Sequence, residues 1–328
     1  MRISRPSRPT VDCERIIYHV GRMIVRPKQN WLRMLFVWNG SVLGDILPQL
    51  LTVTALSSFV AWSHGRLLGH HIPLTVAPFT LLGVSLALCL GFRNTASYER
   101  YWEGRKQWGE LLNLTRSLMR QGLILSSLEK HSPLIKEWAM LLTAFTHALR
   151  HQLRKTDPGV DLARLLSPEV ARNLEAANYK PSAILLLLGE WVADRKREGS
   201  FGEITAAAID RNLHGLSEVL GGCERLASTP LPYPYQVMIH RTVYIYCFLL
   251  PFGLVGDLGI MTPLVSSLVA YTFMAWDAIA EEIEEPFGTM PNDLALDHLS
   301  YGVENNMLEM IGMKISKLAI QPDHFVLR

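Results

Sequence analysis

Three apolar side chains spaced four residues apart, Val84, Leu88 and Phe92, form the pattern in this sequence that could act on ions. A four-residue step drifts by only about 40° around a helix, so the three side chains form one stripe. Copies of such a stripe around a narrow passage exclude water and thereby block ions. A stripe of this kind also occurs where a helix faces lipid or packs in a bundle. The spacing alone leaves both interpretations open.

Other groups could bind metal ions, but their patterns are weak. His70 and His71 are adjacent and cannot share one helical face. The four glutamates between Glu281 and Glu285 could bind a divalent cation, although a solvated or salt-bridged helix end is the favoured interpretation. The sequence also lacks a glycine-rich phosphate loop, an H-E-x-x-H motif and a G-x-S-x-G motif. We therefore predict no metal, no cofactor and no enzymatic activity.

The stripe lies in an uncharged run of 21 residues from Ile72 to Phe92. As a helix, this run reaches about 30 Å, the thickness of the hydrocarbon core of a bilayer. Charged residues follow at once, and the pairs Arg100 with Glu103 and Glu103 with Lys106 are spaced for contact on a helix that continues into water. The sequence thus predicts one long helix that crosses the membrane interface.

Three further uncharged runs complete a prediction of four transmembrane helices: Ile46 to Ser63, Thr242 to Gly256 with extension back to Tyr235, and Leu258 to Trp276. We expect an all-α integral membrane protein with a large cytosolic helical region. The predicted parts are a disordered leader (1–22), an interfacial helix with the first two spans (23–95), a cytosolic helical domain (96–234), the last two spans (235–288) and a cytosolic tail (289–328).

Composition and charge agree with a membrane location. Apolar residues make up 49% of the chain and charged residues 19%, and a net charge of +2 is too small to suggest a nucleic-acid partner. The segment before the first span holds eight Lys or Arg, whereas the short loops at 64–71 and 257–263 hold only Arg66. The positive-inside rule therefore predicts cytoplasmic termini and a cytoplasmic helical region, in the inner membrane.

The segment GFRNTASYERYWEGRKQWG, residues 91–109, resembles the signature of the bestrophin family in its bacterial and chloroplast branch. Arg100, Tyr101 and Trp102 match the Arg-aromatic-Trp part of that signature. Pro286, Phe287 and Gly288 resemble the end of the family's Asn-Pro-Phe-Gly motif. The resemblance extends from Met23 to the end of the 280s, with both motifs in the expected order.

This resemblance implies a homopentameric ion channel in the lipid bilayer, with Val84, Leu88 and Phe92 as the pore neck. It also implies a cytosolic pore constriction near Ile204, beside Glu203. Chloride or another monovalent anion is the expected permeant ion, and a monovalent cation such as sodium is the alternative. A secondary transporter and a membrane-anchored interaction scaffold are rival interpretations, although no internal repeat supports a transporter.

One departure from the family concerns calcium. Calcium-activated animal bestrophins continue their Pro-Phe-Gly motif with a run of aspartates, whereas here Gly288 is followed by Thr-Met-Pro-Asn and then Asp293. We therefore expect conduction that does not depend on calcium.

Overall fold

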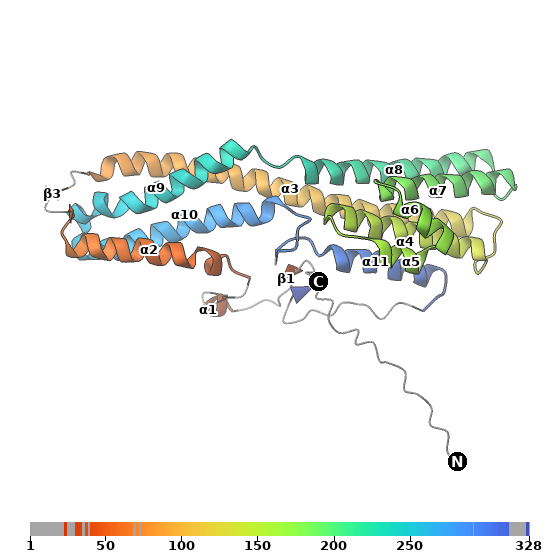
Figure 1. Ribbon diagram of the computed structural model, residues 1–328, viewed down its shortest axis with the longest axis horizontal. Coiled ribbons are helices and arrows are strands. Elements are labelled where there is room, and N and C mark those ends of the chain that lie inside the picture. The colour runs from red at the N-terminus through yellow and green to blue at the C-terminus, as the bar shows by residue number, and fades with distance from the viewer. Residues whose placement is uncertain are drawn as a thin grey trace, which may run out of the picture.

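The computed structural model describes residues 23–24, 30–34, 37–38, 40–67, 70–71, 74–290, 292–314 and 326–327. The helices run along one long axis, so the molecule is a rod (Figure 1). Its two halves are called here the membrane half and, after its predicted location, the cytosolic half. The leader predicted at residues 1–22 lies outside the described part. Of the interfacial helix predicted before the first span, the described residues form one turn, α1 (Trp31–Met34).

The membrane half contains α2 (Leu43–Trp62), the first part of α3 (Val76–Ile124), α9 (Tyr233–Leu258) and α10 (Thr262–Glu284). All lie in helical runs long and apolar enough to cross a bilayer. The run from α9 to α10 turns back at the short helix η1 (Gly259–Met261), where Gly259 adopts a φ of 48°. Its two limbs pack side by side (Figure 1). The four predicted spans therefore correspond to four helical limbs.

The predicted long helix is confirmed by α3, which continues unbroken for 49 residues from the membrane half into the cytosolic half. Of the two charge pairs predicted along it, Lys106 and Glu103 are in contact at 2.6 Å. The Arg100–Glu103 prediction is wrong, because the Arg100 guanidinium donates to backbone carbonyls of other segments. The turn predicted between the first two spans contains a small hairpin of β2 (Arg66–Leu67) and β3 (His70–His71).

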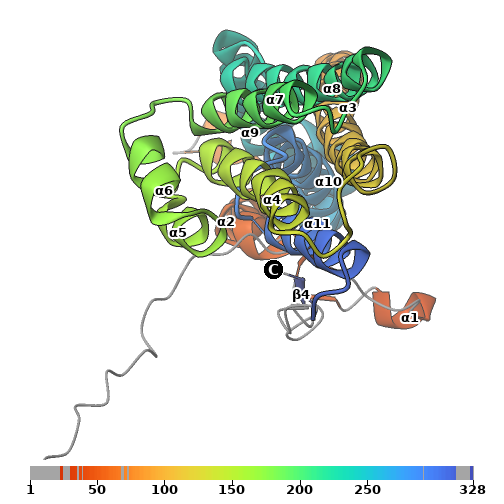
Figure 2. The same cartoon turned by 90° about the vertical axis from the view of Figure 1, so that its right-hand side faces the viewer.

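The cytosolic half contains six further helices around the C-terminal part of α3, some of which contact α3 directly and others only through a neighbouring helix (Figure 2). They are α4 (Pro133–Leu153), α5 (Gly159–Leu165), α6 (Pro168–Glu175), α7 (Lys180–Arg197), α8 (Glu203–Ser228) and α11 (Leu296–Met310). Ser132 caps the N-terminus of α4 and Ser167 that of α6, each followed by proline at the first helical position. A last strand, β4 (Val326–Leu327), pairs antiparallel with β1 (Met23–Ile24).

An aromatic stack joins three of these helices in the cytosolic core. The Trp138 ring of α4 stacks on Trp191 of α7 at 4.5 Å between centroids. Its indole N–H donates to the Leu118 carbonyl of α3 at 3.1 Å. Because two large buried rings and a satisfied indole meet here, the lower part of α3 is held rigidly against the domain.

Candidate functional site

The apolar stripe of α3 lies on a face that the other described residues of the protomer leave mostly exposed. Val84, Leu88 and Phe92 are 57%, 60% and 71% exposed, whereas Leu86 and Leu90 on the opposite face are buried in the membrane core. About two and a half turns of one helix thus bury one side and present three large apolar side chains on the other. The face could meet lipid, another protein, or its own copies around an axis.

A buried ion pair sets the rotation of α3 at the lower end of the stripe. Arg93, the residue after Phe92, pairs with Asp277 of α10 and lies 3.9 Å from a carboxylate oxygen of Glu284. Asp277 in turn contacts the His240 imidazole of α9 at 2.7 Å. Consecutive residues differ by about 100° around a helix, so while Arg93 points into the protein, Phe92 is turned away from Asp277 and is exposed.

The ion pair is the functional feature that the sequence interpretation missed. Arg93 and Asp277 are 184 positions apart, and Arg100 donates to the backbone carbonyl of Glu284 at the same separation. Two arginines seven residues apart on α3 therefore contact two residues seven positions apart on α10. This equal spacing, visible in the sequence, indicates two parallel helices packed in register.

Arg100 joins the ends of two helices. Its Nη atoms donate to the carbonyls of Leu226 and Thr229 at 2.7 Å, where α8 ends, and its Nε donates to the Glu284 carbonyl at 3.1 Å, where α10 ends. The last carbonyls of a helix lack partners within the helix and carry partial negative charge, so a guanidinium is well suited to bind them. Arg100 therefore ties both helices to α3.

The other two residues of the signature differ in burial. Tyr101 packs at the edge of the cytosolic core, and Trp102 is exposed, with the Arg105 guanidinium 5.9 Å from its ring centroid.

The Pro-Phe-Gly motif packs against α3 one turn below Arg100. A Cβ atom added to Gly104 would lie 3.1 Å from the Phe287 ring and 3.2 Å from Pro286, so only glycine fits there without displacing them. The backbone at Gly288 similarly approaches Asp293. These contacts position the chain as it leaves the membrane half; they do not line the stripe.

The predicted lower constriction is far from the stripe along the rod. Glu203 and Ile204 begin α8 at its end away from the membrane half (Figure 1). Ile204 is 88% exposed, and the Glu203 carboxylate is 3.4 Å from the ammonium group of Lys196. The protomer therefore leaves a large apolar side chain and an acid uncovered at this end too.

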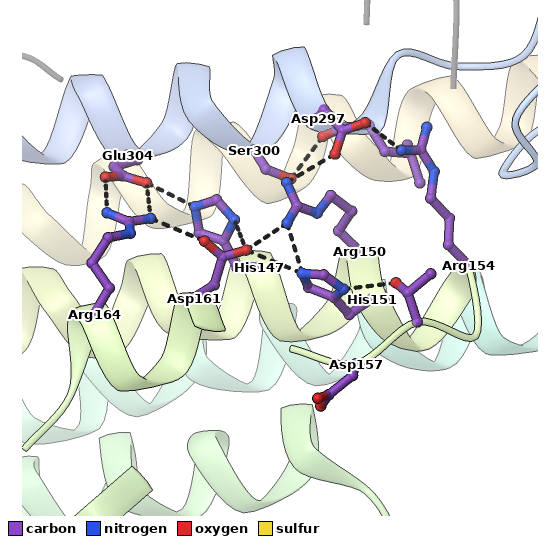
Figure 3. A network of polar contacts seen from close by, with 12 residues as sticks. His147, Arg150, His151, Arg154, Asp157, Asp161, Arg164, Asp297, Ser300 and Glu304 are labelled. Atoms are coloured by element: carbon purple, nitrogen blue, oxygen red, sulfur yellow. Dashed lines mark hydrogen bonds and ion pairs between the residues drawn. The ribbon is translucent and has the colours of Figure 1, made fainter. Parts of the chain in front are cut away.

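A buried ionic network fastens α11 to α4 and α5 (Figure 3). His147 of α4 contacts Glu304 of α11 at 2.8 Å and Asp161 of α5 at 3.5 Å. Asp161 also contacts Arg150 at 2.6 Å, and Glu304 contacts Arg164. These partners lower the pKa of Glu304 to about 2, despite the burial that opposes it.

The acidic residues predicted near the end of the fourth span do not converge. Glu284 is buried beside Arg93, and Glu282 accepts a hydrogen bond from Asn292 at 3.0 Å. In the described part of the chain, no three His, Cys, Asp or Glu side chains are grouped to hold a metal ion.

Comparison with known proteins decides the family. Residues 23–309 match the family described as Bacterial/Fungal Bestrophin protein. The chain belongs to the bestrophin family. This bestrophin is 50% identical over 290 residues to a voltage-dependent anion channel-forming protein of Ralstonia nicotianae, covering 88% of this chain and 95% of the relative. It is 44% identical over 288 residues to YneE of Escherichia coli K12, also called a voltage-dependent anion channel-forming protein, covering 88% and 94%.

Solved structures agree on the fold. The crystal structure of a bacterial bestrophin homolog from Klebsiella pneumoniae matches with a TM-score of 0.78 and 44% identity, covering 82% of this chain and 99% of that chain. This bestrophin is therefore an almost entirely helical membrane protein, as the hydropathy pattern and the signature predicted.

Proposed function

We propose that this bestrophin is an ion channel that passes small anions, chloride foremost, through a pore on the axis of a symmetric assembly. The observation that carries the proposal is the exposed stripe of Val84, Leu88 and Phe92 on a helix whose other side is buried. A ring of apolar side chains blocks ions by excluding water when it is narrow. The names of the relatives support anions as the permeant class.

The assembly is a homopentamer in the inner membrane, with both termini and the long helical region in the cytoplasm. One protomer cannot enclose a pore, because its stripe faces outward. Copies of α3 around a common axis would cover the stripe and close a passage. The basic residues before the first span support the orientation.

Two further roles follow from the placement of the other predicted site residues. Ile204 forms a second apolar constriction at the cytosolic exit, with Glu203 at its rim. Arg100, Tyr101, Trp102 and the Pro286-Phe287-Gly288 motif hold the junction between the two halves and do not touch the ions. Support comes from the exposure of Ile204 and from the carbonyl contacts of Arg100.

A monovalent cation channel of the same fold is the second candidate. The observation in its favour is the Glu203 carboxylate, which is 88% exposed beside Ile204. A ring of such carboxylates would attract cations to the exit.

Purified protein in proteoliposomes tests the proposal. We expect chloride flux that is absent from protein-free vesicles, unitary current steps in planar bilayers, and a particle of five times the 37.0 kDa chain mass by native mass spectrometry. Chloride flux without unitary current steps would indicate a transporter, and the absence of any flux would indicate a scaffold. Sodium flux without chloride flux would indicate the cation channel.

A further inference from the structure

Below the neck, the basic residues of α3 face away from the stripe. Relative to Phe92, Arg93 is rotated by about 100° and Arg100 by about 80°, so both lie on the buried side of the helix. Arg93 is paired with Asp277, and Arg100 donates to carbonyls at the ends of α8 and α10. Neither positive charge is therefore available on the side of the stripe.

Glu99 is the first ionisable side chain on that side. It lies seven residues after Phe92, which places it within about 20° of the same direction on the helix. The side chain is exposed, and no ion pair or side-chain hydrogen bond to it occurs within the part of the chain that the structure describes.

The next charges on the same side are mixed in sign. Glu103 is held by Lys106 at 2.6 Å and by Gln107 at 2.9 Å, and these contacts lower the pKa of its carboxyl group. Lys106 and Glu110 then line a groove of about 530 Å³ between α3 and α8. Because Lys106 offsets Glu103, and Glu110 lies farther along α3, Glu99 carries the uncompensated charge nearest to the neck.

We propose that Glu99 forms a ring of carboxylates directly below the neck, where it attracts monovalent cations and holds back anions, and so reduces the anion preference of the pore. This inference rests on the proposed function, since a ring exists only if the stripe faces a symmetry axis. Symmetry repeats the charge once per protomer at one level of the pore. At 0.1 M salt the potential of each charge extends about 10 Å, so the repeated charges act together on a passing ion.

Reversal potentials in planar bilayers under a sodium chloride gradient test the ring. We expect Glu99→Gln to raise the chloride-to-sodium permeability ratio about threefold, with a larger effect at low salt. Glu99→Asp keeps the charge and should keep the ratio. The matched control is Glu169→Gln, which removes an exposed carboxylate from α6, far from the stripe, and should leave the ratio unchanged. An unchanged permeability ratio in Glu99→Gln, with intact currents, overturns this inference and leaves the proposed function standing.

A chemical restoration of the charge provides a second test. In Glu99→Cys, a sulfonate-bearing methanethiosulfonate reagent should return the permeability ratio to that of the wild type, and an ammonium-bearing reagent should raise it further. The wild-type protein treated with the same reagents is the control for Cys89, which is partly exposed. Identical ratios with both reagents overturn the inference, whereas absence of any flux from the wild type overturns the proposed function and the ring with it.

Discussion

The buried ion pair of Arg93 and Asp277 determines which face of α3 is exposed. Each side chain is 4% exposed, so each charge has lost most of its hydration and depends on the other. Removal of one partner from such a pair leaves an uncompensated buried charge. The pair therefore favours one rotation of α3, in which Phe92 faces outward.

We expect Asp277→Asn to lower the free energy of unfolding by about 3–5 kcal/mol, because Arg93 remains charged and buried without its partner. Thermal unfolding in detergent measures the loss. The control is His240→Gln, which removes another contact of Asp277 from a side chain that is 53% exposed and should cost much less. Equal melting temperatures for wild type and Asp277→Asn would show that the pair does not hold the helix.

In the proposed pore, the size of three apolar side chains determines how narrow the neck is. Replacement of Val84, Leu88 and Phe92 together by alanine should widen and wet the constriction, because dewetting requires a narrow apolar ring. We expect a higher unitary conductance or open probability in planar bilayers. Since all three side chains are more than half exposed in the protomer, their truncation should cost the protomer itself little stability. Unchanged currents from a correctly assembled triple variant would exclude these residues from the gate.

The environment of Asp293 makes it a poor candidate for binding calcium. Burial raises the pKa of its carboxyl group to about 7, and its Oδ2 atom already accepts a hydrogen bond from the Met290 amide at 2.6 Å. Tight calcium sites need several ionised or carbonyl oxygens around one ion. A carboxyl group that has a raised pKa and already accepts a hydrogen bond is a poor calcium ligand. We therefore expect currents to persist in a calcium chelator; currents that vanish there and return with added calcium would contradict this.

At the scale of elements, α11 is held by charges as much as by apolar packing. Its Glu304 lies between His147 of α4 and Arg164, while Asp297 near its start contacts Arg150 at 2.9 Å. Helix α11 follows the Pro-Phe-Gly segment, which packs on α3. The network thus fixes where the chain goes after it leaves the membrane half.

We expect Glu304→Gln to lower the free energy of unfolding by about 3 kcal/mol, since it removes the buried carboxylate that His147 and Arg164 share. Limited proteolysis should then cut near α11 sooner than in the wild type. The matched control, Glu309→Gln, removes a carboxylate from α11 for which the structure shows no ion pair among the described residues. Equal cleavage rates for the two variants would contradict the role of the network.

The contacts of Glu304 also predict how the stability of the protein depends on pH. The pKa of Glu304 is lowered to about 2 from an ordinary value of 4.5, so the native state binds fewer protons than the unfolded state between these values. Its contribution is therefore full above pH 4.5 and is lost as the pH falls toward 2. Acid unfolding of Glu304→Gln should be less steep than that of the wild type over this range. Parallel curves would show that Glu304 does not carry this dependence.

Patterns along the sequence predicted structural features that depend on residues close in the chain. They missed contacts between residues that are far apart in the chain. The change from an uncharged run to a charged one predicted that α3 crosses the membrane interface. The four-residue spacing predicted that the three side chains of the stripe lie on one face of that helix. Arg100 was expected to pair with Glu103 because the spacing allows it. In the fold, carbonyls of Leu226 and Thr229, more than 100 positions away, compete for the same guanidinium and hold it.

At the scale of the whole molecule, the rod places two exposed apolar positions at different heights, the stripe in the membrane half and Ile204 at the far end of the cytosolic half (Figure 1). An apolar ring carries no charge with which to distinguish chloride from sodium. In the proposed channel, the preference between anions and cations must therefore come from the electrostatic fields between and beyond its two apolar rings. The N-terminus of α8 attracts anions through its free N–H groups, whereas Glu203 in its first turn opposes that attraction.

Glu203→Gln should therefore raise the chloride-to-sodium permeability ratio, because it removes a carboxylate repeated around the exit and leaves the helix N-terminus unopposed. The change should be smaller than that for Glu99→Gln, since Lys196 lies 3.4 Å from Glu203 and offsets part of its charge. The two sites are far apart along the rod, so their effects on the logarithm of the ratio should add in the double variant. Leu88→Ala is the uncharged control: it should alter conductance with little effect on the ratio. Reversal potentials measure all of these variants, and a large shift in Leu88→Ala with none in Glu203→Gln would place the selectivity in the neck.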